Sequence, residues 1–210
     1  MRRRARGSTG GGVARRGLFE ARGLGHAEAM RVAFLAVLVA CVVVLPASAA
    51  SIEPRNLVVA ASDVPAGFRV DPGETGVRTN ERDAREVPEA RDRFARWERL
   101  IGYQSMYRRG SSRIESRSDV FRAVAGAGRM LSWVDLEARK AGIRSQRRAS
   151  LSIGSGGFVH WVGGGYTFIV WRQGRVFTGV FAEGISRART IALARAQARR
   201  IARELARVGP

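Results

Sequence analysis

The chain has 210 residues, one cysteine, two histidines and a formal net charge of +19. A single cysteine excludes an intramolecular disulfide and a thiolate metal site, and the shortage of histidine excludes a multi-histidine metal site. About 160 residues follow an apolar segment near the N-terminus, which is enough for one domain with one core but not for two. No cofactor is expected from these residues.

The N-terminal fifty residues have the order of an export signal. A basic, glycine-rich leader over 1–29 precedes a segment over 30–49. The leader would be untranslated if Met30 is the true start. Within the segment over 30–49, an uninterrupted apolar run over 32–45 is followed by small residues. A charged, then apolar, then small sequence is typical of a signal peptide. The remaining residues, 50–210, are predicted to form the exported domain.

Three outcomes stay open for this segment. Signal peptidase would cleave between Ala49 and Ala50, where small side chains stand at the positions that the enzyme requires. Alternatively, Cys41 would be lipidated, as in a lipoprotein. In the third case, residues 32–50 would remain as a membrane anchor, since they just span a hydrocarbon core of roughly 30 Å. In each case the arginines of the leader stay cytoplasmic, so the domain faces outward.

The predicted elements follow in chain order. An apolar run over 56–61 favours a short strand, and the prolines and glycines over 63–73 favour a loop after it. Pro88 favours the start of a helix that carries Phe94, Trp97 and Ile101 on one face, and Gly102 favours its end. Side chains alternate over 103–109 and over 113–121, which predicts a hairpin of two half-buried strands.

A second helix is predicted over 124–138, where apolar residues form one stripe before Gly142. A short strand over 158–162 precedes the strongest strand signal, two β-branched and aromatic runs over 166–184. Gln173-Gly174 is expected to form the tight turn between them. Together these elements predict an α+β fold, an antiparallel sheet flanked by two or three helices.

The last predicted helix, over 187–208, has two distinct sides. Apolar residues gather on one side, namely Ile191, Ala194, Ala198, Ile201, Leu205 and Val208. Four arginines follow another side at four-residue spacing, Arg195, Arg199, Arg203 and Arg207. Like charges at this spacing repel by a few tenths of a kcal/mol per pair, a cost that a bound polyanion would relieve. A solvated surface is the alternative interpretation.

Catalytic patterns are weak. His160 is the only histidine beyond the leader, and Ser152 and Ser155 lie near it in the sequence, but no spacing assigns an acid partner. The glycine-rich stretch 154–157 is similar to half of a phosphate-binding loop, yet strands rather than a helix are expected after it. Six aromatic residues would form the core or, less simply, stack on a ring ligand: Trp97, Tyr103, Tyr107, Trp133, Trp161 and Trp171.

Four short stretches carry a family resemblance. DVPAGF at 63–68, GYQSMYRR at 102–109, FIVWRQGRVFTGV at 168–180 and LARAQARRIA at 193–202 resemble a group of secreted bacterial domains similar in shape to the PsbP and LpqN-like folds. The resemblance implies export and an antiparallel sheet flanked by helices. It implies no catalytic residues.

The sequence therefore favours an exported, non-enzymatic binding module of the cell envelope. Residues 101–210 hold 20 basic and 6 acidic side chains, which favours an anionic lipid or wall polymer as partner and no intracellular nucleic acid. Arg172 and Arg175 of the hairpin are expected to extend the basic surface of the last helix. Two alternatives remain, a hydrolase that uses His160 with Ser152 or Ser155, and an anchored structural subunit that binds a protein partner.

Overall fold

A computed structural model describes residues 52–143, 145–147, 153–162 and 165–208, and the predicted leader, apolar segment and cleavage site lie outside these ranges. The helices are α2 (Asn80–Glu86), α3 (Arg91–Trp97), α4 (Val124–Lys140) and α5 (Arg187–Val208), with short 3₁₀ helices η1 (Pro54–Leu57), η2 (Ala61–Asp63) and η3 (Pro88–Ala90). The strands are β1 (Arg69–Val70), β2 (Gly76–Arg78), β3 (Arg99–Arg109), β4 (Ser112–Phe121), β5 (Ser145–Arg147), β6 (Gly157–Val162), β7 (Tyr166–Gln173) and β8 (Val176–Glu183).

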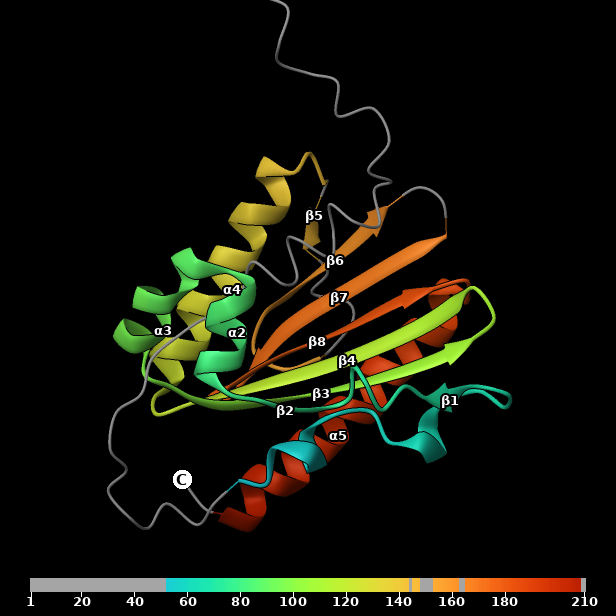
Figure 1. Cartoon of the computed structure of the whole chain (residues 1–210), viewed down its shortest axis with the longest axis horizontal. Helices are drawn as coiled ribbons and strands as arrows, with labels where there is room; N and C mark the ends of the chain where they lie inside the picture. Colours follow the sequence, from blue (N-terminus) through green and yellow to red (C-terminus); the bar gives the residue numbers. More distant parts are fainter. Residues whose placement is uncertain (1–51, 144, 148–152, 163–164, 209–210) are drawn as a thin grey trace, which may run out of the picture.

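The strands form one sheet in the order β1-β3-β4-β8-β7-β6-β5, and β2 also pairs with β3. Every pairing among the described strands is antiparallel. Helices α2, α3 and α4 lie on one face of the sheet, and α5 lies on the other (Figure 1). The predicted class, an α+β fold built on an antiparallel sheet, is confirmed.

Strand β4 shows how the two faces differ, because successive side chains point to opposite sides of a strand. Arg117 points toward α2, where its Nη2 contacts Oδ2 of Asp83 at 2.6 Å. Ser116, the preceding residue, points toward α5 and donates to Oε1 of Gln197 at 2.9 Å. Both residues are buried. The central strand therefore carries a buried polar side chain on each face.

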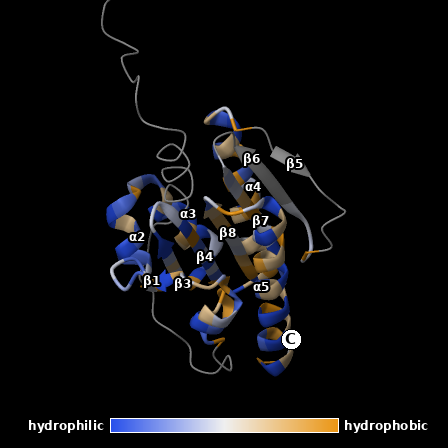
Figure 2. Cartoon of the chain, turned by 90° about the vertical axis from the view of Figure 1, so that its right-hand side faces the viewer, coloured by the Kyte–Doolittle hydropathy of each residue, from blue (hydrophilic) through white to orange (hydrophobic). Residues whose placement is uncertain are grey.

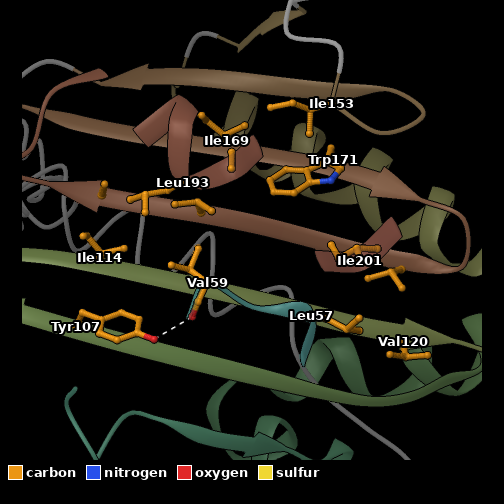
Figure 3. Packing of buried hydrophobic residues seen from close by; sticks show 14 of the residues in the cluster. Leu57, Val59, Tyr107, Ile114, Val120, Ile153, Ile169, Trp171, Leu193 and Ile201 are labelled. Carbon is orange, nitrogen blue, oxygen red and sulfur yellow. Dashed lines mark hydrogen bonds between the residues drawn. The ribbon is translucent and has the colours of Figure 1, made fainter. Parts of the chain in front are cut away.

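Two apolar cores fill the spaces on either side of the sheet. Phe121, Phe177 and Phe181 pack against α3 and α4 on one face. Ile169, Trp171 and Val180 pack against α5 and η1 on the other, the side drawn in Figure 3. Of the aromatic residues considered as ligand-stacking groups, Tyr107, Trp133 and Trp171 are buried, Trp97 and Tyr103 are half-buried, and the side chain of Trp161 lies outside the described part.

The strand predicted over 56–61 is wrong. Residues 54–57 form η1, and Val59, between the extended residues Val58 and Ala60, belongs to no described strand. Instead, its N–H donates to Oγ of Ser116 at 2.9 Å, and its carbonyl accepts from the hydroxyl of Tyr107 at 2.9 Å (Figure 3). Hydroxyl groups on the sheet take the place of a neighbouring strand, so an apolar segment is buried without joining the sheet.

Two predicted boundaries also change. The helix that begins at Pro88 ends at Trp97, where Glu98 adopts a left-handed conformation with φ of 55°, and Ile101 belongs to β3. In the β7–β8 hairpin, Gln173 pairs with Val176, so the turn is Gly174-Arg175 rather than Gln173-Gly174. A φ of 54° at Gly174 explains why a glycine stands first in this turn. The hairpins and helices α4 and α5 otherwise lie where they were predicted, but β4 is buried on both faces and is not half-buried as expected.

Candidate functional site

Helix α5 is fixed to the sheet by an apolar side and one buried amide. Leu193, Ala194 and Ile201 are almost completely buried in the core beneath it. Gln197 is fully buried among them, and its Nε2 donates to Oγ1 of Thr178 at 2.6 Å. Because its Oε1 accepts from Ser116, both ends of the amide are satisfied. The helix therefore has a defined position and a defined outward side.

The outward side carries the arginine ladder, which consists of Arg195, Arg199, Arg203 and Arg207. All four side chains are exposed, and Figure 2 shows hydrophilic and hydrophobic residues alternating along α5. Arg207 is ion-paired with Glu204 at 2.6 Å. Among the described residues, no carboxylate pairs with the other three. Their positive charges are therefore uncompensated on the surface.

A groove lies beside the first half of the ladder. It has a volume of about 450 Å³ and is lined by Ile153, Gly154, Gln173, Arg195, Ala198, Arg199 and Ala202. Of the four ladder residues, Arg195 and Arg199 line it. Nε2 of Gln173 donates to the carbonyl of Ala198 at 3.1 Å, which ties the floor of the groove to the helix. None of the described residues that line the groove is acidic.

Ile153 and Gly154, at the start of the glycine-rich stretch 154–157, line the groove across from α5. Gly154 has a φ of 59°, and a Cβ there would collide with the carbonyl oxygen of Arg172. The N–H of Ser155 donates to this same carbonyl at 2.7 Å. The backbone N–H of Ser155 is therefore already used, and β6 follows instead of a helix. The stretch therefore lacks the geometry of a phosphate-binding loop, and Gly154 is held close to β7.

Of the two hairpin arginines, Arg172 does not join the ladder in one surface. Arg172 follows Trp171 on β7 and so points to the face opposite α5, where its Cδ would lie 3.9 Å from a Cβ on Gly128 of α4. Its Nη2 donates to the carbonyl of Ser155 at 3.3 Å. Arg175 lies half-buried in the β7–β8 turn. The structure thus brings together Arg195 and Arg199 and separates Arg172 from them.

An ionic cluster that was not predicted lies beneath α2 and consists of Arg78, Asp83, Arg99, Arg117 and Asp119. Asp83 contacts Arg78 and Arg117 at 2.6 Å and Arg99 at 3.0 Å, and Asp119 contacts Arg99 at 2.5 Å. All five side chains are buried, with three arginines facing two aspartates. Burial raises the pKa of the Asp83 carboxyl, and the three guanidinium groups oppose that rise. The cluster joins α2 to the sheet.

Other candidate chemistry finds little support. Ser155 is exposed, Ser152 lies outside the described residues, and so does the side chain of His160. Within the described ranges, no group of three or more histidine, cysteine, aspartate or glutamate side chains is placed to hold a metal ion. Glu115 and Asp119 lie on the same face of β4, but Arg117 stands between them. No described helix has the length and apolar character needed to cross a membrane.

Comparisons with known proteins give little more. No family model matches the chain, and no curated protein matches it. Among solved structures, the chain is similar to the extracellular domain of PknH from Mycobacterium tuberculosis, with a TM-score of 0.49 and 8% sequence identity. The match covers 76% of this chain and 98% of that domain. A likeness of this size assigns no family and transfers no residue, so the resemblance to the PsbP and LpqN-like folds stays a prediction.

Proposed function

We propose that this protein is an exported, non-enzymatic module that binds an anionic component of the cell envelope through the outward side of α5. Arg195, Arg199 and Arg203 are the proposed contacts. The observation that carries the proposal is their exposure without a partner carboxylate in the described part of the chain. Export is proposed from the segment over 30–49.

The charge of α5 is local to that face of the molecule. Its 22 residues contain seven arginines and one glutamate. On the opposite face, α2, η3 and α3 carry arginines too, but acidic residues are interspersed and residues 80–98 hold five arginines against six carboxylates. Codon preference for arginine would enrich both faces equally. It does not account for the missing carboxylates on α5.

The proposed contact is electrostatic and shallow. An amphipathic helix that inserts into a membrane uses its apolar side, but in α5 that side is buried in the protein core through Leu193, Ala194 and Ile201. Only arginine and alanine side chains remain outside, at Ala192, Ala202 and Ala206 among others. Binding should therefore weaken as the salt concentration rises, because exposed charges are screened.

A matched pair of triple variants tests this proposal. R195Q/R199Q/R203Q removes three charges from α5, and R85Q/R91Q/R96Q removes three exposed charges from α2 and α3. At about 1 kcal/mol per arginine near an anionic surface, the first should weaken binding by about a hundredfold. The second should change it little. Binding of the purified protein to inorganic polyphosphate, and to vesicles of phosphatidylglycerol and phosphatidylcholine, is the measurement.

Two results would contradict the proposal. Equal losses in the two triple variants would mean that net charge, and not this surface, drives binding. Failure of the unsubstituted protein to bind either probe at low salt would remove the proposed function altogether. Circular dichroism of each variant checks that the fold is retained.

A further inference from the structure

We infer that the ligand of α5 is a flexible phosphate-bearing polymer strand, and that the groove lined by Arg195 and Arg199 holds one of its phosphate groups. This inference rests on the proposed function and narrows it to one ligand class. Three features of the described residues favour a strand over a planar membrane: the winding of the arginine ladder, the concave shape beside Arg195 and Arg199, and the lack of an apolar anchor nearby.

The ladder winds around the helix. A step of four residues in an α-helix turns by about 40° beyond a full turn and rises by about 6 Å. Arg195 and Arg207 therefore lie about 120° apart around the axis of α5. If a flat surface faces Arg199, the side chains at the two ends of the ladder point away from it at an angle. A flexible strand is able to follow the ladder with successive charged groups.

The groove is a defined recess and not part of a flat charged face. Its outer wall is held against β7 by the close approach of Gly154 to Arg172 and by the bond from Ser155 to the same carbonyl. Its inner wall is helix α5, which Gln197 fixes to the sheet. A recess between two rigid elements needs little reordering to accept a ligand, and such preorganisation improves affinity.

Two arginines on one recess suit a phosphate group. A guanidinium donates two parallel hydrogen bonds to one pair of oxygens, so a carboxylate is satisfied by one arginine. A phosphate within a polymer strand keeps two free oxygens that share a full negative charge, and each of them can also accept from a second guanidinium. Arg195 and Arg199 lie one helical turn apart, and both line the recess. A ladder repeat of about 6 Å then presents Arg203 to the next charged group.

An apolar anchor is missing from this side of the described residues. The large hydrophobic side chains that are exposed are Val70, Val77, Leu100, Val124 and Leu136, and none of them belongs to α5 or lines the groove. Stable attachment to a bilayer normally combines charge with an inserted apolar group. The described surface offers charge alone on this side.

Two matched pairs of variants test the inference. Arg199 and Arg203 are both exposed ladder residues without a described partner, but only Arg199 lines the groove. R199Q should weaken polyphosphate binding by about tenfold or more, as for a charge-assisted hydrogen bond, and R203Q by less than about fivefold. A202E places a carboxylate in the groove, and A206E places the same charge one turn farther along α5. A202E should abolish most polyphosphate binding, and A206E should retain more.

The outcomes separate this inference from the proposed function. Equal effects within both pairs would overturn the groove as a phosphate site. Binding to phosphatidylglycerol vesicles without binding to polyphosphate would overturn the strand and favour a membrane surface, while the proposed function would stand. If the unsubstituted protein binds neither probe, both fail together. Titration with inorganic phosphate, which should displace polyphosphate less from R199Q than from R203Q, checks that the groove takes the phosphate group itself.

Discussion

Asp83 holds the ionic cluster together, because its carboxylate contacts the guanidinium groups of Arg78, Arg99 and Arg117. Its side chain is fully buried. Asp83→Asn would leave three buried arginines with Asp119 and with Glu86, which pairs with Arg78 at the edge of the cluster. Removing one partner from a buried ionic group typically costs 3–5 kcal/mol, since the desolvated charge that remains is not compensated. Against a total stability of about 5–15 kcal/mol, this loss is severe.

Urea denaturation followed by tryptophan fluorescence measures the loss, because Trp133 and Trp171 are buried on opposite sides of the sheet. Glu81→Gln provides the control, as it removes one exposed carboxylate from the same helix and should cost less than about 1 kcal/mol. Equal losses in Asp83→Asn and Glu81→Gln would refute the argument. The cluster would then contribute no more to stability than a surface charge.

Two further predictions concern the other buried polar groups. Burial raises the pKa of the Glu115 carboxyl from 4.5 to about 7. Between these two pH values the folded protein keeps a proton that the unfolded chain has lost. The free energy of unfolding therefore falls as the pH rises from 4.5 to about 7. Glu115→Gln should remove this pH dependence, which amounts to about 3 kcal/mol at about 1.4 kcal/mol per pKa unit. The prediction is contradicted if the urea midpoints of the two proteins change with pH in the same way. Gln197→Met should destabilise by about 1–3 kcal/mol, because Ser116 loses its buried acceptor, and an unchanged urea midpoint would show that the amide does not anchor α5.

Periodic sequence patterns were sufficient for the elements that bury one apolar side. Helix α5 spans the predicted residues, and Ala194 and Ile201 of its predicted apolar stripe are fully buried. The β3–β4 and β7–β8 hairpins were also predicted, from alternation in the first and from β-branched and aromatic runs in the second, although β4 and β8 are buried on both faces. In these elements local pattern and tertiary packing require the same residues. Their prediction therefore needed no knowledge of the partners.

Elements that bury polar groups were not predicted, because their burial depends on partners that are distant in the sequence. Helix α2 has no apolar stripe, because its buried residues include Asn80 and Asp83, which face the ionic cluster. The arginines of that cluster come from β2, β3 and β4, so nothing in the local sequence links them. Gly102 is a further sign of the cluster, since a Cβ there would collide with Asp119, but a glycine alone also indicates a helix end. Long-range charge pairing has no periodic signature.

The candidate site was predictable in part. Four-residue spacing on one helix located the ladder, but the groove needs residues about forty positions earlier, at Ile153 and Gly154. Arg172 was expected to extend the basic surface of α5, but it lies on the opposite face of the sheet. A hairpin prediction determines neither the face that each residue takes nor the exact turn. A shift of one residue in a strand moves every side chain to the opposite face. The turn at Gly174-Arg175 differs from the predicted one by that single residue.

The partners of the arginines on α5 separate structural charges from charges available for binding. Arg200 pairs with Asp63 at 2.9 Å, and Arg207 pairs with Glu204, which also accepts the N–H of Glu53. These pairs lie on the flank where η1 and η2 cover the helix, and they tie the start of the domain to α5. Arg195 and Arg199 lie on the other flank, beside the groove, and have no such carboxylate among the described residues. Because repulsion at four-residue spacing destabilises the isolated helix, an uncompensated flank is costly unless an anion occupies it.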